Sequence, residues 1–225
     1  MFEDIYSLYN LSEKKGYDDL TLSQTEKRLT YSLPLVLKQY YSQLGLYSEL
    51  NTVFNQLVSP EQLNLRDSDY LIFYEENQGV VLWAIASSEL SLDDPPVYGS
   101  YDNGNTWVLD ASSLSNFFVS MAYLQAVMGG LPYTSNTMQP DKNEIRLVKE
   151  YIANWHEIKG KNHWYNQIFT RDGKQVFFIM TDAESQWQGI FLACQQEEEF
   201  EQILDTLLID WSYISDEDED DWDEE

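Results

Sequence analysis

The chain has 225 residues, of which 43% are hydrophobic and 15% aromatic, enough for the packed core of one domain or of one domain with an extension. Its 39 aspartates and glutamates outnumber its 13 lysines and arginines, giving a formal net charge of −26. Such a charge disfavours nucleic acid and anionic membranes as partners and favours basic ones, although it can also serve only for solubility.

The single cysteine and the short apolar runs narrow the class of protein further. One cysteine, Cys194, excludes an internal disulfide, and its apolar neighbours predict a buried small residue rather than a nucleophile. Glu3 and Asp4, with no apolar core after them, do not form a signal peptide. The longest apolar run, residues 80–86, is too short to cross a bilayer. We therefore expect a soluble cytoplasmic protein.

The N-terminal part of the chain predicts helices. Apolar residues from Phe2 to Tyr9 recur at helical spacing, and a polar connection follows through Gly16. A second helix is expected to begin at Ser32-Leu33-Pro34, where the serine can cap it and the proline suits its first turn, and to end at Gly45. Its apolar stripe consists of Leu37, Tyr40, Tyr41 and Leu44. A weaker helix is expected over residues 47–58.

The centre of the sequence predicts an antiparallel hairpin. Two apolar runs, residues 70–74 and 80–86, are separated by five polar residues that end in Gly79. The pair Pro95-Pro96 follows, and two consecutive prolines make a stiff connector or sheet-edge segment.

The rest of the chain alternates between strand and helix signals. We predict a strand over residues 106–109, a helix capped by Ser112 or Ser113 and ended by Gly129-Gly130, and a helix over residues 143–155. Residues 131–140 are turn-rich and give no clear prediction. Strands over residues 164–170 and 174–181 flank the tight-turn pair Asp172-Gly173. A third strand is expected over 188–195 and a last helix over 197–208.

These elements predict an α+β fold with a mostly antiparallel central sheet and helices packed on one face, because no regular β-α-β alternation is present. We expect a single domain over residues 31–214, preceded by a helical extension over residues 1–30. Residues 215–225 form an acidic tail, which should be disordered. The best internal boundary lies at residues 131–142.

The sequence contains no recognisable catalytic or metal-binding constellation. His156 and His163 are seven residues apart with Gly160 between them, and further ligands are lacking nearby, so no metal site is predicted. The acids in Glu75-Glu76 and in Asp93-Asp94 are adjacent, and adjacent strand residues point to opposite faces. We predict no catalytic residue, no cofactor and no metal, although an active site assembled from distant residues stays open.

Two stretches carry a family resemblance. The sequence FYEENQGVVLWAI from Phe73, followed by DDPPVY from Asp93, resembles the hallmark region of the SUKH superfamily. Leu33-Pro34, with the apolar helix that ends at Gly45, is similar to its N-terminal motif. The superfamily includes yeast cell-wall-synthesis regulators and bacterial immunity proteins. The resemblance implies a non-enzymatic binding role and supplies no catalytic residues to carry over.

We therefore predict an immunity protein that binds and neutralises a cognate basic toxin, for which a nuclease is one candidate. The alternatives are a regulatory scaffold of the same superfamily and a small-molecule enzyme with a site between sheet and helices. The predicted toxin contacts are four acids beside the hairpin and the proline pair, with exposed aromatic residues as further anchors: Glu75, Glu76, Asp93 and Asp94. We expect a monomer in the free state that binds neither nucleic acid nor membrane.

Overall fold

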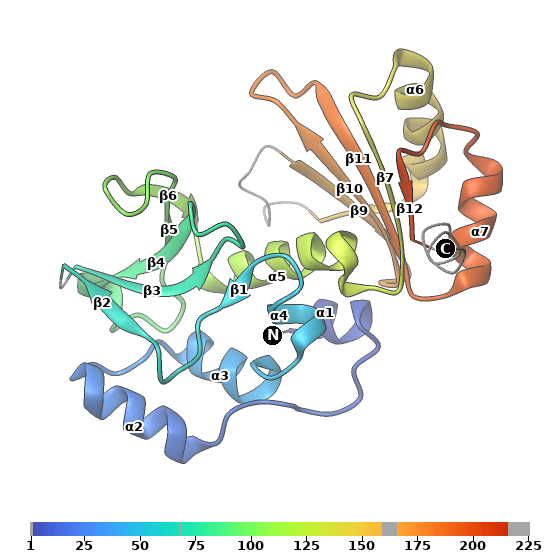
Figure 1. Cartoon of the computed structure of the whole chain (residues 1–225). Helices are drawn as coiled ribbons and strands as arrows, with labels where there is room; N and C mark the ends of the chain where they lie inside the picture. Colours follow the sequence, from blue (N-terminus) through green and yellow to red (C-terminus); the bar gives the residue numbers. More distant parts are fainter. Residues whose placement is uncertain (1, 68, 159–165, 216–225) are drawn as a thin grey trace, which may run out of the picture. The chain divides into compact units, whose positions relative to one another are not determined.

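The structure, a computed structural model, describes residues 2–67, 69–158 and 166–215 (Figure 1). Over these residues the chain forms seven α-helices and twelve strands. The strands form two six-stranded sheets with antiparallel pairing, so the predicted α+β class is confirmed. The chain clusters into two compact units, which are described separately: unit 1 is residues 12–122, and unit 2 is residues 2–11 and those from Tyr123 onward.

Unit 1 holds the sheet with strand order β1-β3-β4-β5-β6, in which β2 also pairs with β3. Its helices are α2 (Asp19–Leu29), α3 (Leu35–Leu44), α4 (Ser48–Asn51), the 3-10 turn η1 (Ser87–Glu89) and the first part of α5 (Leu114–Gln125). Its strands are β1 (Gln56–Leu57), β2 (Asn64–Arg66), β3 (Tyr70–Glu75), β4 (Leu82–Ala86), β5 (Val97–Ser100) and β6 (Val108–Ala111). The predicted hairpin is the pair β3–β4.

The core of unit 1 is aromatic and joins β3 to helices α3 and α5. Phe73 contacts the ring of Phe117 edge-on, with centroids 5.3 Å apart, and Phe118 stacks on Tyr40 of α3 at 3.6 Å. The predicted end of α3 is confirmed, since Gly45 is its C-cap residue. The helix begins at Leu35, so Pro34 is the N-cap residue and does not lie in the first turn as predicted. Ser32 does not cap the helix.

Helix α2 was missed in the sequence, where only a polar connection was expected. The Asp18 carboxylate accepts a hydrogen bond from the Thr21 backbone N–H at 2.8 Å, which satisfies a free donor of the first turn. Arg28 donates to the backbone carbonyls of Pro60 and Leu63. Few apolar residues mark this helix because polar contacts attach it. The weaker helix expected over residues 47–58 shortens to α4 and is followed by β1.

Unit 2 holds the sheet with strand order β12-β7-β11-β10-β9-β8. Its helices are α1 (Glu3–Leu8), the π-turn η2 (Ala126–Gly130) that follows α5, α6 (Lys142–Tyr151), the 3-10 turn η3 (Ile152–Asn154) and α7 (Glu197–Thr206). Its strands are β7 (Tyr133–Met138), β8 (His156–Glu157), β9 (Asn166–Arg171), β10 (Gln175–Thr181), β11 (Trp187–Cys194) and β12 (Tyr213–Ile214).

The second predicted hairpin forms β9 and β10. Asp172 and Gly173 at its turn both have positive φ, 53° and 68°, as a tight two-residue turn requires. Strand β7 was not predicted, because its polar residues resemble a turn. It lies inside the sheet between β11 and β12, and Ser135 and Thr137 on it are buried.

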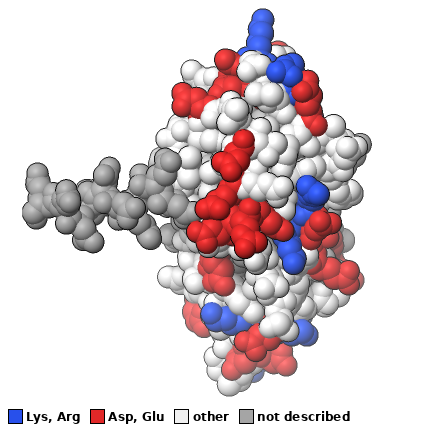
Figure 2. All heavy atoms as spheres, turned by 90° about the vertical axis from the view of Figure 1, so that its right-hand side faces the viewer, with Lys and Arg blue, Asp and Glu red and all other residues white. Residues whose placement is uncertain are grey.

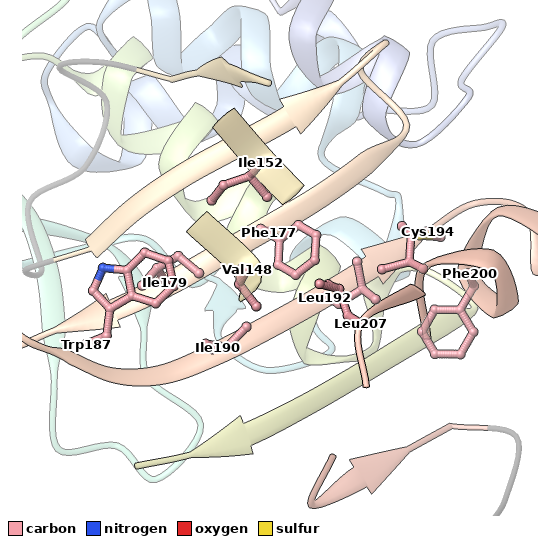
Figure 3. Close-up of a cluster of buried hydrophobic side chains, with 11 residues drawn as sticks. Val148, Ile152, Phe177, Ile179, Trp187, Ile190, Leu192, Cys194, Phe200 and Leu207 are labelled. Atoms are coloured by element: carbon pink, nitrogen blue, oxygen red, sulfur yellow. The ribbon is translucent and has the colours of Figure 1, made fainter. Parts of the chain in front are cut away.

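Helices α6 and α7 cover one face of the unit 2 sheet (Figures 1 and 3). Phe177 and Ile179 of β10 point to this face together with alternate residues of β11, as the pleat requires. The buried cluster that they form extends from Trp187 at one end to Phe200 of α7 at the other (Figure 3). Cys194 belongs to this cluster and is fully buried, as predicted.

The predicted extension over residues 1–30 is divided, because residues 2–11 cluster with unit 2 and the following residues with unit 1. Gln195, directly after β11, donates hydrogen bonds to the carbonyls of Ser7 and Leu8, and so attaches the end of α1 to the sheet. The tail from residue 216 lies outside the described residues. Among the described helices, none combines the length and hydrophobicity needed to cross a membrane.

Gly16 provides a test of unit 1 packing. A Cβ atom at Gly16 would lie 2.2 Å from the carbonyl oxygen of Tyr41, so residues 15–17 must move away from α3. Two backbone hydrogen bonds join these segments, from Lys15 to Gln43 and from Tyr17 to Tyr41. We expect Gly16→Ala to lower the free energy of unfolding by about 1–3 kcal/mol. Urea denaturation measures the change, and Lys14→Ala, at an exposed neighbour, is the matched control. Equal stability of the two variants would contradict this packing.

Candidate functional site

The four acids predicted as toxin contacts lie in two places in unit 1. Glu75 and Glu76 are at the β3–β4 turn, before β4 begins at Leu82. Asp93 and Asp94 are in the β4–β5 connection, after β4 has ended at Ala86. Because β4 runs from one connection to the other, the two pairs lie at opposite ends of the strand. They therefore do not form one continuous acidic patch.

Asp94 is engaged in holding α5. Its carboxylate accepts hydrogen bonds from the backbone N–H of Ser115 at 2.9 Å and from the Ser115 hydroxyl at 2.6 Å. A carboxylate at a helix N-terminus also interacts favourably with the helix dipole. The backbone carbonyl of Asp93 accepts from the N–H of Val36 in the first turn of α3, while the Asp93 side chain is exposed. The β4–β5 connection thus contacts the first turns of both α3 and α5.

Glu75 and Glu76 lie at the hairpin end of the sheet. Glu75 is half-buried and pairs with Leu82, whereas a Glu76 carboxylate oxygen accepts from the backbone N–H of Val80 at 3.3 Å. A small hollow of about 190 Å³ adjoins Glu75, with polar residues such as Gln56 and Asn64 in its lining. Glu75 is therefore a predicted contact that lies beside a hollow in the surface of the sheet.

The face of the unit 1 sheet that points away from α5 carries apolar and aromatic side chains. Residues that pair directly across strands share a face, so Ile72, Ala84, Tyr98 and Leu109 form one row over four strands. Leu109, at the edge strand, is 62% exposed. We call this surface the aromatic face and define it by Tyr70, Ile72, Leu82, Ala84, Tyr98, Trp107 and Leu109.

Three aromatic rings form the outer layer of the aromatic face. Trp107 stacks on Tyr70 with ring centroids 4.4 Å apart, and Tyr98 contacts Tyr70 edge-on at 5.9 Å. The Tyr98 hydroxyl donates to Glu89 at 3.3 Å, and burial together with the Glu89 carboxylate raises the pKa of Tyr98. Exposed aromatic residues were expected as anchors, but the sequence did not single out these three. The sequence did contain a signal for this face. Tyr70 and Ile72 are two residues apart, as are Trp107 and Leu109, so each pair points to the same side of its strand.

A buried carboxylate on the opposite face was also missed. Asp110 is 5% exposed and accepts hydrogen bonds from the Trp83 indole N–H at 2.6 Å and from the Tyr101 hydroxyl at 3.0 Å. Both of these donors are neutral groups, and Trp83 lies on β4, so Asp110 attaches the edge strand β6 to β4. This contact holds in place the strand that carries Leu109.

Positive charge is absent from long parts of the sequence. All 13 lysines and arginines lie within residues 14–66 and 142–174, so β3 to β6 and α5 contain none. The chain after Lys174 has 17 acids and no lysine or arginine, and α7 exposes Glu197, Glu198, Glu201 and Asp205. Figure 2 views the side on which α7 lies in Figure 1, and acidic side chains gather in its centre.

A second candidate site is a groove within unit 2, with a volume of about 760 Å³. Aromatic walls come from Trp155, Phe169 and Trp187, and charged side chains from Asp4 and Lys149 lie among them. The complete lining is Asp4, Lys149, Ile152, Ala153, Trp155, His156, Glu157, Ile158, Gln167, Phe169 and Trp187. A smaller hollow of about 330 Å³ shares Asp4, His156 and Ile158 with it.

Two predicted chemical features can now be placed. Burial and the nearby Glu199 raise the pKa of the Cys194 thiol to about 12, so it is protonated at neutral pH and is not a thiolate nucleophile. His156 lines the groove, whereas His163 lies outside the described residues. In residues 2–67, 69–158 and 166–215, no group of three or more His, Cys, Asp or Glu side chains could hold a metal ion.

Comparison of this chain with protein-family models, with curated proteins and with solved structures finds no match. The resemblance to the SUKH superfamily therefore stays a prediction from the sequence.

The different environments of Asp93 and Asp94 give a direct test of the connector. We expect Asp94→Ala to lower the free energy of unfolding by about 1–2 kcal/mol, because it leaves the first turn of α5 without its acceptor. Asp93→Ala removes an exposed side chain but keeps the backbone carbonyl that α3 uses, so its effect should stay within about 0.5 kcal/mol. Thermal and urea unfolding of both variants measure the difference. A larger loss at Asp93 than at Asp94 would refute this assignment.

Proposed function

We propose that this protein is an immunity protein that acts in the cytoplasm by binding a basic protein toxin in a stoichiometric complex. The aromatic face of unit 1 supplies the binding surface, with Glu75 and Glu76 at its hairpin end. The observation that carries the proposal is an aromatic face with an exposed leucine, on strands β3 to β6, which contain no lysine or arginine. Arg66 of the short strand β2 pairs with Tyr70 at the rim of this face.

The chemistry of this face suits a basic protein partner. Tyrosine and tryptophan are enriched in interface centres, where their large rings lose little conformational entropy on binding. The acids of unit 1 create a negative field that speeds encounter with a basic surface. A toxin that cleaves nucleic acid needs a basic substrate surface, so covering it would block its activity. The predicted SUKH resemblance supports the same role.

The alternative is a regulatory scaffold of the same superfamily. An aromatic, acidic sheet face can bind any basic protein, and nothing in its geometry is specific to a toxin. The two roles differ in the partner rather than in the surface. Co-expression with a growth-inhibiting protein encoded beside this chain tests the choice. Rescue of growth and a one-to-one complex on gel filtration support the immunity role. Failure of both, with recovery of a non-toxic cellular protein instead, favours the scaffold.

Leu109 should be a central contact in the complex. We expect Leu109→Lys to weaken binding at least about tenfold, because it places a charge in an apolar contact and repels a basic partner. Leu208 is 82% exposed and belongs to unit 2, so Leu208→Lys is the matched control. Titration calorimetry with the partner compares the two variants. Equal effects would show that total charge, and not the aromatic face, determines affinity.

Charge reversal at the hairpin should act on the rate of association. We expect Glu75→Lys with Glu76→Lys to lower the association rate about tenfold at low ionic strength and only slightly at high salt, where exposed charges are screened. Asp93→Lys, at the other end of β4, should have a smaller effect. Stopped-flow measurements over a range of salt concentrations give both rates. An unchanged association rate at low salt would show that the hairpin acids do not belong to the interface.

A further inference from the structure

We propose that the groove in unit 2 binds an arginine side chain flanked by apolar residues, presented by a peptide segment of a basic protein. This site goes beyond the proposed function, which assigns binding to the aromatic face of unit 1. The juxtaposition that carries the proposal is aromatic walls from Trp155, Phe169 and Trp187 beside the carboxylates of Asp4 and Glu157.

The groove lies at the edge of the unit 2 core. Trp187 and Ile152 belong both to its lining and to the buried cluster under α6 and α7 (Figure 3). Trp155 contacts Phe177 of the same core edge-on, with centroids 5.3 Å apart. The aromatic walls are therefore fixed by core packing. A preformed wall loses little entropy when a ligand binds, and 760 Å³ is within the range of ligand sites.

A positive group already occupies one wall. The Lys149 ammonium lies 5.0 Å from the centroid of the Trp187 ring, which is cation–π geometry. The ring is thus oriented to receive a cation from the groove side, and the chain supplies one from α6. A guanidinium suits this environment better than an ammonium, because it is planar, stacks on indole rings and is more weakly hydrated.

The charges of the groove favour the same ligand. Two carboxylates, those of Asp4 and Glu157, lie in the lining against one ammonium, that of Lys149, so the formal charge of these groups is negative. The adjoining hollow shares Asp4 and adds the carboxylate of Asp172. Carboxylates accept paired hydrogen bonds from a guanidinium, which fixes its orientation. The apolar wall residues Ile152 and Ile158 suit the residues that flank the arginine.

The test is an NMR titration of the isotope-labelled full-length chain with the peptide N-acetyl-Leu-Arg-Leu-amide, following the indole N–H signals of Trp155 and Trp187. We expect saturable shifts of these signals. The same peptide with citrulline in place of arginine has nearly the same shape without the charge and should bind at least about tenfold more weakly. Equal binding of the two peptides, or no saturable shift, would overturn the proposal.

Two variants with opposite expected effects identify the contacts. Asp4→Asn should weaken binding about threefold to tenfold, whereas Glu3→Gln, at its exposed neighbour on α1, should change it less than about twofold.

Lys149→Met removes the competing cation from Trp187 and should tighten binding about threefold to fivefold, an improvement that loss of folding cannot produce. Lys142→Met, on the same helix but outside the groove, is its control.

Weaker or unchanged binding by Lys149→Met would contradict the role of the Trp187 ring. Equal effects of Asp4→Asn and Glu3→Gln would show that only the general negative field attracts the peptide, and would overturn the site. Because the indole signals of Trp155 and Trp187 report on the groove, this experiment stays separate from the toxin test. A missing toxin complex leaves the groove proposal standing, and a failed peptide titration leaves the aromatic face unaffected.

Discussion

The packing of α5 against one face of the β3–β4 hairpin is the constraint on which the rest of unit 1 depends. Phe117 contacts Phe73, Tyr74 and Trp83, and the bulge between Ile72 and Tyr74 turns both Phe73 and Tyr74 toward the helix. Once this face is buried, the pleat sends Tyr70, Tyr98 and Leu109 to the other side. The aromatic face is thus a consequence of where the core lies.

The connector between β4 and β5 makes this packing specific. Its prolines limit the backbone, the carbonyl of Pro95 accepts from the N–H of Leu114, and Asp94 holds Ser115. The start of α5 is therefore fixed by a segment that is distant in sequence. A residue that looks like a solvated acid serves here as part of the fold. The proposed contacts are therefore neighbouring groups that do not hold the fold together.

The two proposed sites are both surfaces whose aromatic side chains are held by the fold. In unit 1 a sheet presents aromatic rings whose positions are set by cross-strand pairing, and in unit 2 a groove presents indole rings that the core holds. Both surfaces combine aromatic side chains with an excess of carboxylates. This combination selects for positive charge on a partner, because a desolvated cation gains both from the ring faces and from the acids.

The sequence by itself determined the local elements with strong signals. The hairpin at residues 70–86, the turn at Asp172-Gly173, helix α3 and the burial of Cys194 follow from periodicity and turn chemistry, which act between near neighbours. The net charge of −26 also follows from the sequence alone, and the sequence contains no familiar catalytic motif. Helix α2 and strand β7 were not predicted, because polar contacts, rather than an apolar pattern, stabilise them.

Only the tertiary structure decided which of these elements share a sheet and which residues meet. The sequence suggested one central sheet, but strand pairing over long distances divided the strands between two. The sequence also suggested one group of contacts, made of Glu75, Glu76, Asp93 and Asp94. In the structure, β4 separates the first pair of acids from the second. The groove joins Asp4 to Trp187 across most of the chain, and no local pattern encodes such a contact. Register and long-range packing depend on the whole core, which a reading of neighbouring residues cannot supply.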